Sequence, residues 1–343
     1  MPSNKLAKRV LIAATAAAAG FAVRSATRVR YDFRNKSVLI TGGSRGLGFV
    51  LARIFAEQGA RLTLVARHQS SLDAAEVALR DLGAEVLTIA CDIRNRDEAA
   101  SAVQRAIDFH GAVDVLINNA GIIQVGPLDL MTLDDFEAAM AVHAWGPLYL
   151  IRAVLPHMRA RGGGRIVNIS SIGGKIAVPH LTPYTVSKFA LAGLSDAIRA
   201  ELAADGIKVT SVFPGLMRTG SHVNANFKGD HEKEFALFSL MDALPIFSIN
   251  ARRAGRQIVE ACRSGRPELI ITMQAKAAVI FSSLMPGLMA VAMKLTSALL
   301  PKAASVEGVE CRSGWDSTSA WSPSVLTRLA DKAIEENNEY RAA

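Results

Sequence analysis

A tyrosine and a lysine stand four residues apart in the run Tyr184-Thr185-Val186-Ser187-Lys188. On a helix this spacing places both side chains on one face. A nearby ammonium group favours the phenolate and lowers the pKa of tyrosine from its ordinary value of about 10. The phenol can then give a proton to a carbonyl oxygen or take one from an alcohol. Such a pair is common by chance, so its neighbourhood decides what it means.

Two serines, Ser170 and Ser171, end a predicted strand shortly before this tyrosine. Ligands bind at the carboxyl ends of strands in a parallel sheet. A serine hydroxyl there can hold a substrate oxygen and stabilise developing charge. A nucleophilic role for Ser171 is disfavoured because no G-x-S-x-G elbow surrounds it.

A glycine-rich turn, TGGSRGLG, follows the first predicted strand and opens a helix. Glycine lets the backbone turn sharply and approach a ligand closely. The helix N-terminus then presents free N–H groups and a positive dipole end to an anion. This placement predicts a site for the diphosphate of a dinucleotide, held by Thr41, Gly42, Ser44, Arg45, Gly46, Leu47 and Gly48.

The end of the second predicted strand bears on the choice of cofactor. An acidic side chain there would bond the ribose 2′-hydroxyl of NAD, but the residues are Ala66 and Arg67. Arg45 and Arg67 could clamp a 2′-phosphate with planar, multiple hydrogen bonds. We therefore expect NADP(H) to be preferred over NAD(H); the alternative is that both arginines are ordinary surface residues.

From residue 37 onward, apolar strands alternate with helices, which indicates an α/β fold with a doubly wound parallel sheet. A bend is expected near Gly146-Pro147, and Leu216–Ile246 has no regular pattern. The predicted strands are 37–41, 61–66, 84–90, 113–118, 165–170, 207–213 and 268–272. The predicted helices are 46–58, 70–82, 95–110, 132–161, 183–204 and 249–263, with a further charged helix within 324–340.

Four motifs follow one another along the chain: the glycine turn, Asn118-Asn119-Ala120-Gly121, the set Ser171, Tyr184 and Lys188, and Pro214-Gly215 with Thr219. With these motifs in family order, the chain resembles the short-chain dehydrogenase/reductase family over roughly residues 35–273. The resemblance implies a seven-stranded Rossmann-type sheet of order 3-2-1-4-5-6-7. It also implies hydride transfer between C4 of a nicotinamide and a carbonyl or alcohol carbon.

The same resemblance implies roles for single residues. Tyr184 would be the acid/base, and Lys188 would hold the nicotinamide ribose and tune the tyrosine. Asp92 matches an adenine contact, and Asn119 and Gly121 match the loop beside the adenosine ribose. The Pro214-Gly215 motif extends to Thr219, which matches a residue that contacts the carboxamide or the diphosphate of the cofactor. A homodimer or homotetramer built through helices 132–161 and 183–204 is expected.

One position departs from the family pattern. Family members usually carry asparagine in the helix after the fourth strand, where it completes a catalytic tetrad that feeds protons through water to the lysine. Here the run is Val142-His143-Ala144-Trp145-Gly146, so His143 occupies that position. The histidine is either a relay that titrates near neutral pH or a residue that keeps the helix bend hydrogen-bonded.

Charge is concentrated at the N-terminus. The chain has 343 residues, 39 basic and 31 acidic, for a net charge of +8, of which +7 lies in residues 1–36. The nearly neutral remainder argues against nucleic-acid binding. The three cysteines, Cys91, Cys262 and Cys311, are widely spaced and lie outside any CxxC or Cys/His cluster. Neither a disulfide framework nor a metal site is therefore expected, and a reducing compartment fits.

Three parts are expected: an N-terminal basic and apolar segment (1–34), the cofactor-binding catalytic domain (35–273) and a partly hydrophobic C-terminal extension (274–343). The first is an uncleaved membrane anchor or surface helix, a mobile tail, or a cleaved signal or transit peptide. In the last, residues 277–293 form either a membrane-dipping or substrate-entrance hairpin, or a helical pair packed on the domain or a partner subunit. A location on the cytoplasmic side, with contact to a membrane surface, is expected.

The expected function is therefore that of an NADP(H)-dependent oxidoreductase acting on a small-molecule carbonyl or secondary alcohol. A lipophilic substrate would suit the apolar residues Phe227, Phe235, Phe238, Met241 and Phe247, although these also suit ordinary packing. The alternative is a catalytically silent NADP(H)-binding sensor or scaffold of the same fold.

Overall fold

A computed structural model describes residues 30–302, 310–319 and 322–340. The chain divides into two units, residues 1–32 and 33–343, and the helices and strands of the described residues lie in the second. The three alternatives for the N-terminal segment fall on residues outside those described.

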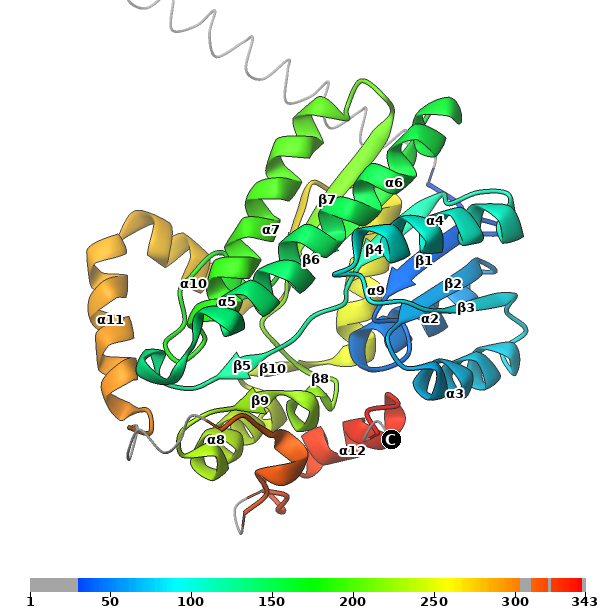
Figure 1. The fold of residues 1–343 in the computed structure, drawn as a ribbon. Helices are drawn as coiled ribbons and strands as arrows, with labels where there is room; N and C mark the ends of the chain where they lie inside the picture. The colour runs from blue at the N-terminus through cyan, green and yellow to red at the C-terminus, as the bar shows by residue number, and fades with distance from the viewer. Residues whose placement is uncertain (1–29, 303–309, 320–321, 341–343) are drawn as a thin grey trace, which may run out of the picture. The chain divides into compact units, whose positions relative to one another are not determined.

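Seven parallel strands form the central sheet in the order β11-β7-β6-β4-β1-β2-β3 (Figure 1). This order confirms the predicted doubly wound α/β fold. Several strand ends differ from the prediction by one or two residues, as is usual for element boundaries. The strands are β1 (Ser37–Thr41), β2 (Arg61–Ala66), β3 (Val86–Ala90), β4 (Val115–Asn118), β6 (Gly164–Ile169), β7 (Ile207–Phe213) and β11 (Glu268–Ile270).

Helices cover both faces of this sheet, which is why its strands are continuous apolar runs. On one face α2 (Gly46–Ala56) packs against α3 (Gln69–Arg80) and α9 (Ala251–Ser264). On the other face α4 (Arg96–His110) packs against α6 (Gly146–Ala160), and α7 (Thr182–Glu201) lies over β6 and β7 (Figure 1).

The predicted helix over 132–161 consists of three parts. A capping box between Thr132 and Asp135 starts α5 (Leu133–Met140). A π-helical turn, Ala141–Trp145, then leads directly into α6. The expected bend is therefore a widened turn just before Gly146, and Pro147 sits in the first turn of α6, where a proline is tolerated.

The prediction that Leu216–Ile246 is irregular is wrong for much of its length. It contains β8 (Leu216–Arg218), β9 (Asn226–Phe227) and α8 (His231–Ala243), whose N-terminus is capped by Asp230. The buried side of α8 mixes polar and apolar residues (Glu234, Phe235, Ser239 and Asp242), so the sequence shows no apolar stripe. Short strands β10 (Ser248–Asn250), β5 (Gln124–Val125) and β12 (Arg312–Ser313) pair with β8 and β9.

The C-terminal extension is helical, as predicted. It contains α10 (Met273–Leu284), α11 (Pro286–Leu299) and α12 (Arg328–Glu336), and the break between the first two falls at the expected Pro286. Helix α10 buries only Ala275, and α11 buries none of its residues. Among the described residues, the helical run Leu133–Ala160 is the one long and apolar enough to cross a membrane. Of its apolar 18-residue stretch, 44% is buried within the domain.

Candidate active site

The structure brings Ser171, Tyr184 and Lys188 together at the carboxyl end of β6. Tyr184 and Lys188 lie one turn apart on α7, with the lysine Nζ 5.5 Å from the centre of the tyrosine ring. Ser171 stands in the turn after β6, where its Oγ accepts a hydrogen bond from the Gly173 amide at 3.0 Å. The hydroxyl of Ser171 also hydrogen-bonds to Tyr184.

Burial sets the protonation of this group. Desolvation lowers the pKa of Lys188 to about 7, and the Nζ donates a hydrogen bond to the Ile169 carbonyl at 3.0 Å. Burial also raises the pKa of Tyr184, and the hydrogen bond with Ser171 acts in the opposite direction. A tyrosine with a raised pKa is protonated at neutral pH, which suits it to give a proton to a carbonyl oxygen.

His143 projects from the π-helical turn toward the same group. Its ring lies edge-on to the Tyr184 ring, 5.4 Å between centres. The Nε2 accepts a hydrogen bond from the Ile122 amide at 3.1 Å, so the proton lies on Nδ1, which donates to Ser187 Oγ at 2.7 Å. Burial, with a smaller contribution from Lys188, holds the pKa of His143 well below its usual range.

The glycine turn is bound to the loop Asn118–Gly121. Thr41 Oγ1 accepts hydrogen bonds from the amides of Asn119 (2.9 Å) and Ala120 (3.0 Å). The Asn119 side chain donates in return to the Thr41 carbonyl at 3.0 Å. Gly42 has a φ of +62°, and a Cβ there would stand 3.0 Å from the Cα of Ala120, so a larger residue would separate the two segments.

The start of α2 has the character of an anion site. Arg45 provides no side-chain cap, and the first turn contains no acidic residue. The Gly46 amide donates to the carbonyl of Asn337 at 2.8 Å, and the buried Glu339 carboxylate lies against the open side of Gly46. A helix end that attracts a carboxylate fits the diphosphate of a dinucleotide.

Other predicted cofactor residues surround this turn. Ser44 is buried, and its carbonyl accepts from Asn338. Leu47 and Gly48 are buried in the first turn of α2. After β7, the Pro214 carbonyl accepts from the Ile172 amide at 2.7 Å, and Gly215 and Thr219 follow. Gly121, in the loop beside the glycine turn, also lies close to the group around Tyr184. A Cβ on Gly121 would stand 3.0 Å from His143 Nε2 and 3.7 Å from Lys188 Nζ.

The segments that follow β2 and β3 carry charged side chains that interact with one another. Arg67 is exposed directly after β2. Asp92 follows β3, and the guanidinium of Arg94 binds its carboxylate, with Nε 2.8 Å from Oδ2. These hydrogen bonds hold the pKa of Asp92 below its ordinary value, and the charge of Arg67 adds to the effect. Arg94 was missed in the sequence, where its only signal was the spacing Asp-x-Arg.

Comparison with known proteins gives consistent results. The model of the short chain dehydrogenase family matches residues 36–228. A dehydrogenase/reductase SDR family protein 7-like from Anopheles gambiae is 40% identical over 195 residues, which are 55% of this chain and 62% of that protein. Dehydrogenase/reductase SDR family member 7B from Danio rerio is 32% identical over 271 residues, which are 76% of this chain and 85% of that protein.

The fold has close structural counterparts as well. The crystal structure of L-sorbose reductase from Gluconobacter frateurii, complexed with NADPH and L-sorbose, aligns with a TM-score of 0.63 and 26% identity. The alignment covers 70% of this chain and 97% of the reductase. With its sheet order, its glycine turn and its Ser171, Tyr184 and Lys188 grouping, this chain belongs to the short-chain dehydrogenase family.

Proposed function

We propose that this protein is an NADP(H)-dependent oxidoreductase that interconverts a carbonyl compound and a secondary alcohol. The observation that carries the proposal is the grouping of Ser171, Tyr184 and Lys188 at one end of the sheet, next to the glycine turn and its partner loop. When bound, the nicotinamide supplies or accepts the hydride. The chain's own residues position the substrate and move its proton.

Each residue of the group has a distinct part in this proposal. The Ser171 hydroxyl holds the substrate oxygen and stabilises its developing charge. Tyr184, protonated at neutral pH, gives its phenolic proton to that oxygen during reduction. Lys188 holds the nicotinamide ribose and favours the phenolate left behind. The glycine turn, Asp92, Asn119, Gly121, Pro214, Gly215 and Thr219 form the remaining cofactor site.

The proposal is tested by following NADPH oxidation with panels of steroid, retinoid, fatty-aldehyde and small ketone substrates. Turnover of at least one class is expected. Tight NADPH binding without turnover of any class would instead support the alternative, a silent sensor or scaffold. The complete Ser171, Tyr184 and Lys188 set argues against that alternative.

A preference for NADPH is supported by Arg45, Arg67 and the absence of an acid at the end of β2. Arg67→Asp is expected to raise the Kd of NADPH by about tenfold or more, because charge-assisted hydrogen bonds contribute about 1.5–3 kcal/mol. The Kd of NADH should stay the same or fall. Fluorescence titration measures both, with Arg256→Asp, an exposed position on α9, as the matched control. Equal NADPH affinity in both variants would rule out this use of Arg67.

His143 is proposed as a positioning residue. Both ring nitrogens are hydrogen-bonded, and Ser187, one of the partners, in turn donates to the Tyr184 carbonyl at 2.8 Å. Because the low pKa keeps the ring neutral, His143→Asn is expected to leave the pH profile of kcat/KM unchanged between pH 6 and 8. The Tm should fall because buried hydrogen bonds are lost. A profile that loses an ionisation in this range would show instead that His143 relays protons.

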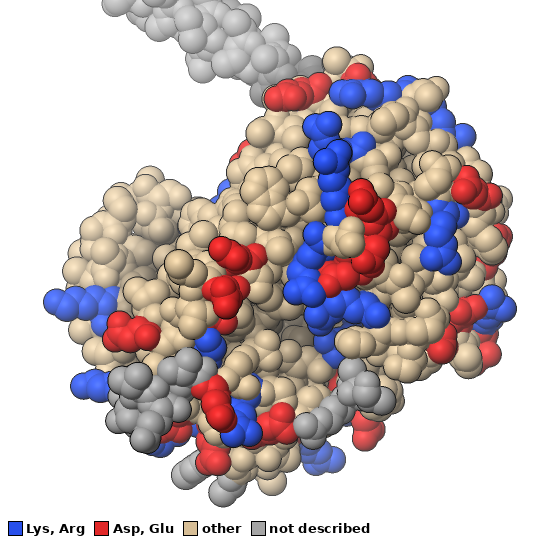
Figure 2. Space-filling model, in the orientation of Figure 1, with Lys and Arg blue, Asp and Glu red and all other residues tan. Residues whose placement is uncertain are grey.

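A lipophilic substrate and a membrane surface are proposed from the hairpin of α10 and α11. It exposes large apolar side chains, among them Leu284 (76% exposed) and Leu299 (86% exposed). From Met273 to Lys302 its only charges are three lysines, which suits anionic lipid headgroups. Figure 2 shows this lobe, at the left, as largely uncharged. Exposed Ile246 and Phe247 lie next to it, since the Ile246 carbonyl accepts from Gln274 on α10.

Removing apolar side chains from the hairpin is expected to weaken membrane binding several-fold. The test variant carries Leu284→Ser, Leu288→Ser and Leu295→Ser, all exposed, and the control carries Leu133→Ser, Val325→Ser and Leu326→Ser elsewhere on the surface. Co-sedimentation with phosphatidylcholine vesicles containing phosphatidylserine measures binding. Equal binding of both variants would contradict a membrane role for the hairpin. A cytoplasmic-side location is proposed with it, because NADPH is available there.

A homodimer or homotetramer is also proposed. The helices expected at the interface leave Trp145, Val186 and Phe189 exposed, so their outer faces can bury apolar area against a second copy. Light scattering on the purified protein tests this proposal, which a monomer at micromolar concentration would contradict.

A further inference from the structure

The last residues of the described chain lie on the glycine turn. After α12, residues 337–339 form what we call the C-terminal strap. The Gly46 amide donates to the Asn337 carbonyl at 2.8 Å, and the Asn338 side chain donates to the Ser44 carbonyl at 3.3 Å. The Asn337 side chain donates to the Thr219 carbonyl at 3.1 Å. The strap therefore joins the glycine turn to the segment after β7.

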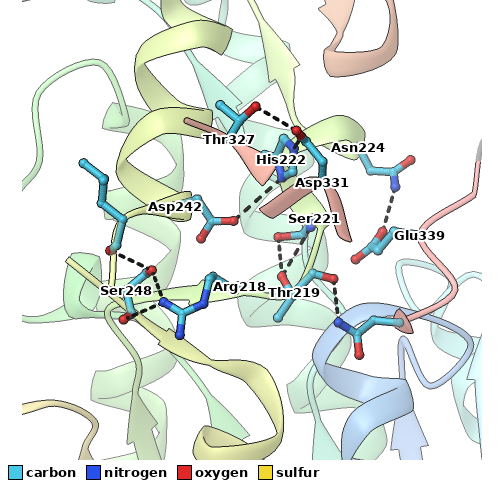
Figure 3. Close-up of polar contacts among 12 residues, drawn as sticks. Arg218, Thr219, Ser221, His222, Asn224, Asp242, Ser248, Thr327, Asp331 and Glu339 are labelled. Atoms are coloured by element: carbon cyan, nitrogen blue, oxygen red, sulfur yellow. Dashed lines mark hydrogen bonds and ion pairs between the residues drawn. The ribbon is translucent and has the colours of Figure 1, made fainter. Parts of the chain in front are cut away.

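The strap places a carboxylate at the N-terminus of α2. Glu339 is 3% exposed, and its Oε2 accepts from the Asn224 side-chain amide at 2.7 Å (Figure 3). The same oxygen lies 3.5 Å from Arg45 Nε. Its other oxygen, Oε1, is the atom nearest to the position where a Cβ on Gly46 would stand. Glu339 therefore fills the open side of the turn, where the backbone is free of side chains and suited to an anion.

Helix α12 fixes where the strap lies. Ala330 and Ala333 are buried, and Asp331 accepts a hydrogen bond from Thr327 at 2.7 Å. The buried His222 lies between two carboxylates, with Nδ1 3.7 Å from Asp242 on α8 and Nε2 3.7 Å from Asp331 on α12 (Figure 3). The strap is joined to the end of α12 by hydrogen bonds from the Asn337 amide to the Ala333 carbonyl (3.1 Å) and from the Glu339 amide to the Ile334 carbonyl (2.9 Å). Departure of Glu339 from the turn would break bonds at this helix end, but not the buried contacts of Ala330, Ala333 and Asp331 that hold α12.

A dinucleotide diphosphate and the Glu339 side chain cannot share this position, because both would occupy the open side of Gly46 at the N-terminus of α2. Burial disfavours the charged form of this carboxyl group. Desolvation raises the pKa of Glu339 to about 7, while Arg45 and Asn224 act in the opposite direction. Burial of this carboxyl group therefore carries a desolvation cost that is recovered when the side chain returns to water.

We propose that the C-terminal strap is an autoinhibitory contact that occupies the cofactor's diphosphate position and leaves the glycine turn when the dinucleotide binds. The inference rests on the proposed function, since it takes the glycine turn as the dinucleotide site. It predicts that the strap competes with NADPH and that removing the Glu339 carboxylate strengthens NADPH binding.

The test compares the full chain with Glu339→Ala and with the matched control Glu335→Ala, an exposed acid on α12. Fluorescence titration gives the Kd of NADPH, and hydrogen exchange of the wild-type chain reports the backbone amides of residues 337–340. Glu339→Ala is expected to lower the Kd at least fivefold, and Glu335→Ala to leave it unchanged. Exchange in the strap is expected to rise when NADPH, or inorganic pyrophosphate alone, is added.

Two results would overturn the inference while leaving the proposed function intact: NADPH binding that Glu339→Ala leaves equal or weaker, or strap exchange that stays the same or falls at saturating NADPH. The strap would then be a structural part of the site. NADPH binding to neither the wild type nor Glu339→Ala is a different result, since it would overturn the proposed function and this inference with it. The exchange measurement needs no variant and so stands even if Glu339→Ala fails to fold.

Discussion

Tyr184→Phe is expected to lower kcat/KM for NADPH-dependent carbonyl reduction by about a thousandfold, within the range typical for loss of a general acid. The phenyl ring keeps its place beside His143 and Lys188, and only the phenolic hydroxyl, with its hydrogen bond to Ser171, is lost. The Kd of NADPH should therefore change by less than about twofold, which is under 0.5 kcal/mol. Steady-state kinetics and fluorescence titration on the same preparation measure the two quantities.

Tyr149→Phe is the matched control for this change. Tyr149 is a partly buried tyrosine on α6 that packs against the core on that face of the sheet. Its variant should keep the activity of the wild type. Retention of more than about a tenth of the wild-type kcat/KM in Tyr184→Phe would exclude Tyr184 as the proton donor.

Lys188→Met is expected to abolish measurable turnover and, at the same time, to stabilise the fold at low pH. Desolvation lowers the pKa of Lys188 to about 7 from an ordinary value of 10.5. Between these two values the unfolded chain binds more protons than the folded one, so wild-type stability rises with pH across that window. Below pH 7 the buried ammonium lowers the free energy of unfolding by several kcal/mol. Methionine at this position carries no charge and avoids that cost.

The gain from Lys188→Met should exceed the loss of its hydrogen bond to the Ile169 carbonyl, which is about 1–3 kcal/mol. Differential scanning fluorimetry should therefore show a Tm several degrees above the wild type at pH 6, with the difference shrinking at pH 9. Lys208→Met, at an exposed position on β7, should show no such pH-dependent gain. A lower Tm for Lys188→Met at pH 6 would mean that the charge of Lys188 is well compensated in the fold.

Local patterns predicted the sheet and the grouping of the candidate catalytic residues. Strands such as Arg61–Ala66 and Ile207–Phe213 match the structure because burial on both faces leaves continuous apolar runs in the sequence. The relation of Tyr184 to Lys188 follows from helical spacing alone. Ser171 meets them because parallel strands end at one edge of a sheet, where the following turns converge.

The features that sequence reasoning missed depend on contacts between distant segments. The π-helical turn that carries His143 coincides with a hydrogen bond to Ser187 on α7, which no local pattern encodes. The strap contacts a turn almost 300 residues earlier, since Asn338 and Ser44 are 294 positions apart. Its sequence, Asn-Asn-Glu, reads as an ordinary polar helix end, and only the packing of α12 brings it to the glycine turn.

Transfer of deuterium from NADPH labelled at C4 to a carbonyl substrate tests the central claim most directly. Mass spectrometry of the alcohol product should find one deuterium on the former carbonyl carbon with the wild-type chain. With Tyr184→Phe the labelled product should be at least a hundredfold less abundant. Bound NADPH that delivers no deuterium to any carbonyl in the panel, or transfer that persists at the wild-type rate in Tyr184→Phe, would contradict the account.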